Sequence, residues 1–268
     1  MRKLTLVLIL LLGSSISTHF FVNSSPSSIL RDLSFENNII ELVSSNSANL
    51  EFKIPEREIL SYGIKGYLKM QEDGKISPGK PLTVIDFSLP SSEKRMWIID
   101  MKDGMILHYG LVSHGRNSGD LMAQKFSNIS SSFMSSLGFY LTGETYQGKH
   151  GYSLRLDGLE KGFNDKARER AIVIHGADYA HENFIQQTGR LGRSLGCPAL
   201  PNEIANEVID LIKEQSLLFI YGKDKELQSI ANLVIFAGIR KDIAKMPESE
   251  KDVLTDLLLL MDKYDLYG

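Results

Sequence analysis

The only cysteine of the chain, Cys197, lies 22 positions after a histidine, His175, and each of the two is flanked by a glycine. A thiol nucleophile with an imidazole base is the pair that acyl transfer through a covalent intermediate requires. Gly176 directly follows the histidine and Gly196 directly precedes the cysteine, so the backbone can turn sharply or approach a substrate closely at both places. Pro198 favours extended backbone angles at Cys197, which keeps the thiol out of a helix. These residues predict a thiol acyl-transfer site.

A short buried strand is expected to carry the histidine, because residues 171–174 form an apolar run that ends at His175. A loop over 143–151, which carries glycines and tyrosines, is expected to line the site. The serine-rich segment 117–138 is expected to be ordered, with hydroxyl groups bonded to the backbone. Other strands are expected over 82–89, 96–101, 105–113, 139–142, 152–156 and 217–221, and helices over 55–70 and 202–215. The pattern predicts a mainly β protein with flanking helices, of the α+β class.

Length and charge limit the organisation of the chain. The 268 residues allow one sizeable core, and the net charge of −3 gives no reason to expect a nucleic-acid partner. Residues 1–17 resemble a signal peptide, with Arg2 and Lys3 before an apolar run over 4–12. That run is too short to span a bilayer. We therefore expect export to the periplasm or cell envelope, without stable membrane insertion after cleavage.

The remaining chain divides into three expected parts. Residues 18–54 are predicted to be a linker with at most one short helix, 55–222 the catalytic domain, and 223–268 a C-terminal helical extension packed on it. Exported proteins usually pair their cysteines, so a single thiol favours a reactive group. The alternative is a small buried residue that only fills space.

Beyond these patterns, the His-Gly pair and the later Ser194-x-Gly-Cys motif resemble the L,D-transpeptidase catalytic domain (YkuD type), in a branch where Pro-Ala follows the cysteine. The other matching pieces are Phe126–Asn128, Ser135–Tyr140, Gly148–Leu154 and Gly189–Ser194. The matching region covers about Tyr62 to Tyr221. The resemblance implies a β-sandwich catalytic domain and an enzyme that acts on peptidoglycan stem peptides through a cysteine thioester.

Carried over by position, Cys197 is the nucleophile, His175 the base, and Gly176 the residue whose carbonyl orients the imidazole. The backbone N–H groups of Gly196 and Cys197 are the candidates for the oxyanion hole. We also expect the imidazole to pair with the thiol and lower its pKa. Ser194 is expected to bond either the turn or the substrate.

This chain departs from the commoner motif after the cysteine, where Pro198 and Ala199 replace an apolar residue and an arginine. A substrate carboxylate then needs another cation, for which Arg193 is the first candidate, Arg190 the second and Lys149 the third. Tyr146 and Tyr152 are expected to line the substrate groove. The structural alternatives are that the tyrosines only pack and that the two arginines belong to a solvated loop.

Several alternatives stay open at this stage. His114, which also precedes a glycine, is a rival base, while His108, His150 and His181 are expected to be surface or loop residues. No spacing typical of a metal site is present, and no cofactor is expected. The alternatives to a murein L,D-transpeptidase are an L,D-carboxypeptidase that uses the same site and a wall-binding protein that has lost turnover.

Overall fold

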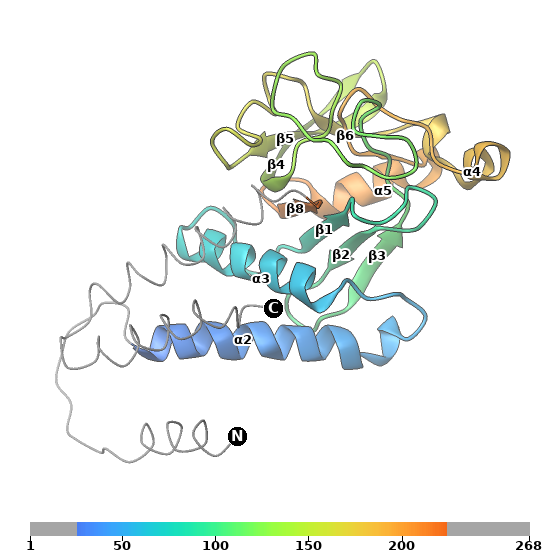
Figure 1. Ribbon diagram of the computed structural model, residues 1–268. Helices are drawn as coiled ribbons and strands as arrows, with labels where there is room; N and C mark the ends of the chain where they lie inside the picture. The colour runs from blue at the N-terminus through green and yellow to red at the C-terminus, as the bar shows by residue number, and fades with distance from the viewer. Residues whose placement is uncertain (1–25, 224–268) are drawn as a thin grey trace, which may run out of the picture.

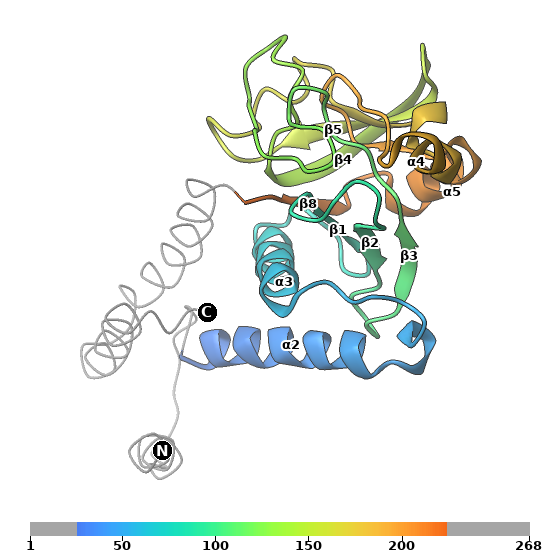
Figure 2. The same ribbon diagram turned by 45° about the vertical axis from the view of Figure 1, so that its right-hand side comes forward.

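The computed structural model describes residues 26–223, and their side chains from residue 35 onward. The expected signal segment and nearly all of the expected C-terminal extension lie outside these residues. Within residues 26–223, no helix combines the length and the apolar character needed to cross a bilayer. The elements (Figures 1 and 2) are α2 (Pro26–Ser45), η1 (Ser47–Asn49), α3 (Arg57–Glu72), β1 (Leu82–Asp86), β2 (Met96–Ile99), β3 (Ile106–Gly110), β4 (Gly138–Gly148), β5 (Gly151–Gly158), β6 (Val173–Gly176), η2 (Asp178–Ala180), α4 (Glu182–Thr188), β7 (Ala199–Leu200), α5 (Asn202–Ile212) and β8 (Leu217–Tyr221).

The eight strands form one curled sheet in the order β3-β2-β1-β8-β4-β5-β6-β7. Neighbouring strands are antiparallel except in the β1–β8 and β6–β7 pairs, which are parallel. The predicted α+β class is confirmed. The resemblance implied a β-sandwich, and its two layers are the two halves of this single sheet. The halves are joined because the long strand β4 pairs with β8 at one end and with β5 along its length.

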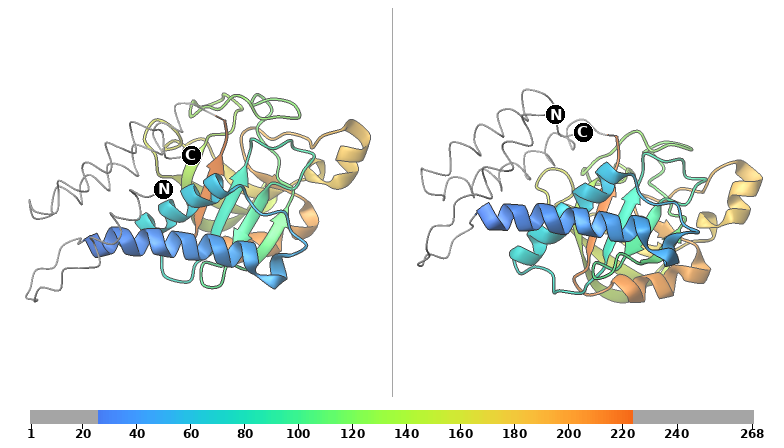
Figure 3. Two further views of the ribbon diagram at one scale, coloured as in Figure 1. Left: turned by 60° about the horizontal axis from the view of Figure 1, so that its bottom comes forward. Right: turned by 90° about the horizontal axis from the view of Figure 1, so that it is seen from below.

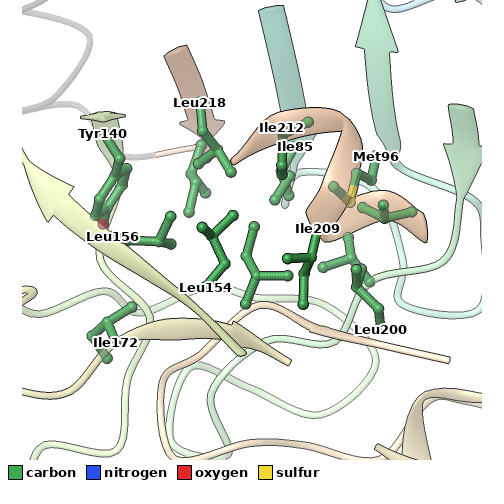
Figure 4. Close-up of a cluster of buried hydrophobic side chains, with 14 of the residues drawn as sticks. Ile85, Met96, Tyr140, Leu154, Leu156, Ile172, Leu200, Ile209, Ile212 and Leu218 are labelled. Atoms are coloured by element: carbon green, nitrogen blue, oxygen red, sulfur yellow. The ribbon is translucent and has the colours of Figure 1, made fainter. Parts of the chain in front are cut away.

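The main core lies between the two halves of the sheet and is closed by α5. Alternate residues of β5, Leu154 and Leu156, face inward, as a strand with one buried face requires. The amphipathic helix α5 adds Ile209 and Ile212 to the same cluster (Figure 4). The strand that carries His175 is therefore held between β5 and α5 on a packed support.

The second core lies on the other face of the β1-β2-β8 half, which α3 covers together with α2 (Figure 3). Two glycines in α3 allow the close packing. A Cβ at Gly66 would lie 2.2 Å from the Phe139 ring, and one at Gly63 would lie 3.2 Å from Leu82. Glycine in a helix interior costs about 1 kcal/mol relative to alanine, and here close packing against the sheet offsets that cost.

Two segments differ from the expectation. Residues 18–54 were expected to hold at most one short helix, whereas α2 extends over 20 residues and buries Ile39, Ile40 and Val43. These apolar residues are spaced for one helix face, but serine and asparagine around them obscure the pattern. The segment 143–151 was expected to be a loop, whereas it forms the outer part of the β4–β5 hairpin.

Candidate active site

The Cys197 thiol lies against the first residues of β6. The Val173 N–H donates to its Sγ over 3.4 Å, and the thiol itself faces the Ala171 carbonyl at 3.6 Å. Ala171 has a positive φ of 54°, which is uncommon for a residue with a Cβ and turns its carbonyl towards the sulfur. Cys197 is half-buried and is not part of a disulfide.

Residues 194–197 form a loop, called the nucleophile loop after the nucleophile predicted from the sequence. Ser194 closes this loop by two hydrogen bonds. Its hydroxyl donates to the Cys197 carbonyl over 2.6 Å and accepts the Gly196 N–H over 3.0 Å. Glycine is required at 196, where φ is +128° and a Cβ would lie 2.8 Å from the Met134 carbonyl oxygen. Of the two roles expected for Ser194, the structure shows the first, in which its hydroxyl bonds the turn. The Gly196 N–H, which was expected in the oxyanion hole, already has a partner in this structure.

His175 is buried, with 2% of its surface exposed. Its Nδ1 donates to the Gly176 carbonyl oxygen over 2.8 Å, so the neutral ring keeps an unprotonated Nε2. The pKa of His175 is lowered, chiefly by burial and to a smaller extent by the charge of His150, while the hydrogen bond to Gly176 acts in the opposite direction. The ring is therefore an unprotonated base at neutral pH.

The expected contact between the thiol and the imidazole is not a hydrogen bond in this structure. β6 and β7 pair in parallel with His175 opposite Ala199, which places Cys197 beside Val173. His175 lies two residues further along β6, a rise of about 6.6 Å for a strand. Burial raises the pKa of the Cys197 thiol, against the lowering influence of the Val173 N–H and the Arg170 charge. The prediction of a depressed thiol pKa is therefore wrong for this resting arrangement.

Arg170 is a neighbour of the thiol that sequence reasoning missed. Its guanidinium binds four neutral acceptors of the serine-rich segment 117–138: the carbonyl oxygens of Ser127 and Met134 and the hydroxyls of Ser132 and Ser136. A Cβ placed on Gly196 would lie 3.4 Å from its Nη2. Among the described residues, no carboxylate pairs with this cation. The positive charge of Arg170 therefore acts on the nucleophile loop. No motif in the charged segment 160–170 indicated this contact.

The serine-rich segment is ordered through its hydroxyl groups, as expected. Ser135 accepts the Gly115 N–H and donates to the Gly196 carbonyl over 3.1 Å, which joins two loops to the segment that carries Cys197. Ser118 accepts the Ser135 N–H over 2.9 Å. These bonds, together with those of Arg170, hold residues 127–136 against Gly196, the neighbour of Cys197.

The two arginines expected to bind a substrate carboxylate already share an acidic partner. Arg193 Nη1 donates to Asp120 Oδ1 over 2.6 Å and to the Gly119 carbonyl over 3.0 Å. Arg190 Nε lies 3.8 Å from the same carboxylate. Arg116 differs from both, because its exposed guanidinium lies over the Phe133 ring at 4.2 Å and has no acidic partner within residues 26–223. The backbone N–H of Arg116 donates to the Ser194 carbonyl over 2.8 Å, so Arg116 lies beside the nucleophile loop.

The two tyrosines of the hairpin lie on opposite faces. Tyr146 pairs with Ser153, which pairs with His175, so Tyr146 shares the face of the imidazole. Its ring carries the Arg155 guanidinium at 4.5 Å. Tyr152 lies on the core face and donates to Asp210 of α5 over 2.9 Å, which fits the packing alternative. Lys149 is exposed at the tip of the hairpin.

His150, also at that tip, was expected to be a surface residue. It is exposed, but its ring stacks on the His175 ring, with centroids 4.4 Å apart and planes inclined by 26°. This contact could not be predicted from the sequence, because the two histidines are far apart in the chain and meet only through the register of the β4–β5 hairpin. His181 caps α4, whereas His108 is half-buried and its shielded Nε2 has no partner among the described residues.

His114, the rival base, has both ring nitrogens engaged. Its Nδ1 contacts Arg95 Nη2 at 2.9 Å and its Nε2 faces the Gly119 carbonyl oxygen at 3.3 Å. Burial, followed by the charge of Arg95, lowers the pKa of His114 to about 4. This arrangement suits a structural role. Within the described residues, no group of three or more His, Cys, Asp or Glu side chains is placed to hold a metal ion.

Residues 53–221 match the family model of the L,D-transpeptidase catalytic domain. The chain belongs to this family, whose members act on peptidoglycan, and the match supports a transpeptidase-type function.

Solved structures similar to this chain include an L,D-transpeptidase from Mycobacterium smegmatis, at 14% identity and a TM-score of 0.34, covering 53% of this chain and 59% of that one. An L,D-transpeptidase from Stackebrandtia nassauensis is 12% identical with a TM-score of 0.31, covering 80% of this chain and 99% of that one. Among curated proteins, a segment of 53 residues is 45% identical to sucrose-phosphate synthase 4 of Arabidopsis thaliana and 42% identical to sucrose-phosphate synthase of Spinacia oleracea. That segment covers 20% of this chain and only 5% of either synthase.

Proposed function

We propose that this chain is an exported murein L,D-transpeptidase that acts on peptidoglycan stem peptides through a thioester on Cys197. The observation that carries the proposal is the position of the thiol at the start of β6. The same short strand carries His175 next to its last residue, and the hydrogen bond of Nδ1 to Gly176 leaves Nε2 of this histidine unprotonated. The family match supplies the substrate class.

In the proposed reaction, Sγ attacks the carbonyl carbon of the bond between the diaminopimelate L-centre and D-alanine, and the thiol proton passes to His175 Nε2. The tetrahedral intermediate collapses as the C–N bond breaks, and the D-alanine amine leaves with the proton from His175. An acceptor amine then attacks the thioester and releases the thiol. Water in place of the amine gives the carboxypeptidase reaction.

The resting thiol and imidazole are both neutral, so the proton moves as the S–C bond forms and not beforehand. Attack requires Sγ to leave the Ala171 carbonyl and turn towards His175, which a rotation about the Cys197 side-chain bond begins. The developing oxyanion is served by the Cys197 N–H, which has no hydrogen-bond partner within the described residues. The Arg170 charge favours both the thiolate and this oxyanion.

For the substrate carboxylate we propose Arg116 in place of the expected Arg193 and Arg190. A buried carboxylate is costly without a cation, and Asp120 already holds both of the other two arginines. The Arg116 guanidinium lies over the Phe133 ring beside the nucleophile loop, and its N–H groups have no hydrogen-bond partner among the described residues, so they can bind a carboxylate. Lys149, which is exposed at the hairpin tip, is the second candidate.

Incubation with tetrapeptide muropeptides, followed by mass spectrometry, separates the candidate activities. Crosslinked dimers from the wild-type protein and none from Cys197→Ala are the result expected for a transpeptidase. Tripeptides alone would identify a carboxypeptidase. Retained binding without any product, from protein shown to be folded by circular dichroism, would replace both with a wall-binding protein.

Export remains part of the proposal and has its own test. Residues 1–17 should direct a reporter enzyme lacking its own signal across the inner membrane, and replacement of the apolar run over 4–12 by polar residues should retain the reporter in the cytoplasm. A reporter that stays in the cytoplasm with the native segment would contradict it.

A further inference from the structure

The tip of the β4–β5 hairpin covers the proposed base. His150 lies in the two-residue turn Lys149–His150, which joins the paired residues Gly148 and Gly151. Its exposed ring stacks on the buried ring of His175, with centroids 4.4 Å apart. The contact joins residues that are 25 positions apart in the chain.

The pairing of the strands explains how the tip reaches the base. Ser153 of β5 lies opposite His175, so residues before Ser153 continue past the end of β6. The left-handed conformation of Gly151, with φ of +75°, closes the turn and brings the chain back over that end. The position of His150 therefore depends on the hairpin register and is not a chance contact of a free loop.

Two contacts of different direction constrain the His175 ring. The hydrogen bond from Nδ1 to Gly176 lies in the ring plane and sets which nitrogen is free. The His150 ring lies on the ring face, so it opposes rotation about the side-chain bonds and excludes water from that face. Without His150, the ring face that it covers would become accessible to water.

We propose that His150 is a positioning residue that holds His175 for proton transfer with Cys197. This inference rests on the proposed function, in which His175 is the base. A base is effective only when it is held within hydrogen-bonding reach of the proton it takes. His150 also affects the charge of the base: a protonated His150 opposes protonation of His175, whereas a neutral ring face favours the imidazolium that forms during attack.

Among the neighbours of His175, His150 is the one whose charge affects the pKa of the His175 ring. Ser153 from β5 and Ala199 from β7 carry no charge, and α5 places Asn202 and Ala205 beside Gly176. The other titratable groups on β5 and α5 are Tyr152, Arg155, Asp157, Glu203, Glu207 and Asp210. Beyond these two elements are the Cys197 thiol, Lys149 in the same turn as His150, Tyr146 with Arg155 over its ring, and Asp178, which accepts a hydrogen bond from Asn202.

The test compares His150→Ala, His150→Phe and Gln147→Ala, a control at an exposed position of the same hairpin. Phenylalanine keeps a stacking ring but removes the charge. We expect His150→Ala to lower kcat about tenfold with little change in KM, because the base is misplaced by a fraction of an ångström to an ångström. His150→Phe should retain most of the wild-type kcat, and Gln147→Ala should match the wild type.

The direct readout is the titration of the His175 ring, followed by NMR of ¹⁵N-labelled protein with His175→Ala for assignment. Loss of a neighbouring positive charge raises the pKa of His175, and loss of burial raises it further. The pKa of His175 should therefore be higher in both variants than in the wild type, and the acid limb of kcat/KM should follow it. An unchanged titration together with unchanged kcat in His150→Ala would overturn the inference. Full activity of His175→Ala would instead reject the base assignment, while the titration would still report the stacking.

Discussion

The Cys197 thiol is subject to two opposed influences that a variant can separate. Burial raises its pKa, while the Val173 N–H and the Arg170 guanidinium favour the thiolate. Arg170 is well suited to this role because its hydrogen bonds go to neutral acceptors, so its charge is not cancelled within the described residues. A cation within a few ångströms typically lowers the pKa of an acid by about one unit or more, less where solvent screens it.

Replacement of Arg170 should therefore shift the pH dependence of thiol reactivity. We expect the rate of Cys197 alkylation in Arg170→Gln to rise with pH along a curve displaced to higher pH than the wild type. Arg170→Lys, which retains the charge and loses part of the hydrogen bonding, should stay near the wild-type curve. Thermal melts would identify any unfolding. Superimposable curves for all three proteins would show that Arg170 only supports the loop.

Arg116 gives a second prediction at this scale. If it binds the substrate carboxylate, Arg116→Gln should lose a charged hydrogen bond of about 1.5–3 kcal/mol, a factor of roughly 10–150 in kcat/KM. The loss should be seen for a substrate with the free carboxylate and be small for its amidated analogue. Arg193→Gln is the matched control, because its partner is Asp120. A preference for the free carboxylate that disappears in Arg193→Gln and persists in Arg116→Gln would restore the expectation from sequence.

Residue identities were predictable where a short stretch of chain carries the chemistry. Cys197, His175 and the carbonyl of Gly176 came from glycine-flanked motifs and from the family resemblance, and the hydrogen bond to Gly176 is present. Arg170 and His150 were not predictable, because their contacts depend on how distant segments pack. The availability of Gly196 was misjudged because the hydroxyl of Ser194 can point either to the turn or to a substrate.

At the scale of elements, the β4–β5 hairpin shows how glycines can hide strands. Gly143, Gly148 and Gly151 interrupt the apolar alternation that marks a strand, so the segment was expected to be a loop. In the structure the ladder shifts register between Thr142 and Thr145 and then continues to Gly148. The irregularity accommodates a bend in the sheet, as such bulges commonly do.

The start of β4 is anchored by a carboxyl group with a strongly shifted pKa. Glu160 accepts the Phe139 N–H over 2.7 Å and an Asn164 amide N–H over 3.2 Å. Burial is the larger influence and raises the pKa of Glu160 to about 7, against these two hydrogen bonds. Below an ordinary glutamate pKa, both folded and unfolded chains carry the proton and the stabilisation is fully present. As pH rises towards and through 7, ionisation of the buried group removes it.

Glu160→Gln should remove this pH dependence. The free energy of unfolding of the wild-type protein should fall between pH 5 and pH 8.5 by on the order of 1–3 kcal/mol from this group, and the variant should show a flatter profile. The amide oxygen of glutamine can still accept the Phe139 N–H. Chemical denaturation at both pH values measures the difference, with the exposed Glu169→Gln as control. Equal slopes in all three proteins would contradict the assignment.

At the scale of the whole molecule, the expected strands and helices are mostly present, but their assembly was not predictable from local pattern. The hairpin from β2 to β3 follows from the Asp103-Gly104 turn. The parallel pairing of β1 with β8 joins residues 82–86 to 217–221, and no local pattern encodes it. The length of α2 was also missed, because its stabilisation comes from packing on α3 and not from its own composition.

The assembly explains why the two proposed reacting groups meet at one short strand, since β6 carries His175 and Cys197 lies beside its first residue, Val173. β6 is held by β5 on one side, by β7 on the other and by α5 next to Gly176, while Ser135 of the serine-rich segment bonds Gly196, the neighbour of Cys197. A rigid support of this kind suits a reaction that depends on the position of a thiol and an imidazole. Thioester formation on Cys197 is therefore the central claim.

The most direct test is mass spectrometry of the intact protein during reaction with a tetrapeptide stem. The account predicts an adduct equal to the substrate minus D-alanine, located on the peptide that contains Cys197 and released by hydroxylamine. It should be absent in Cys197→Ala, which should retain the wild-type melting temperature within a few degrees because little packing is lost. An adduct that persists in Cys197→Ala, or that maps to Ser194, would contradict the account.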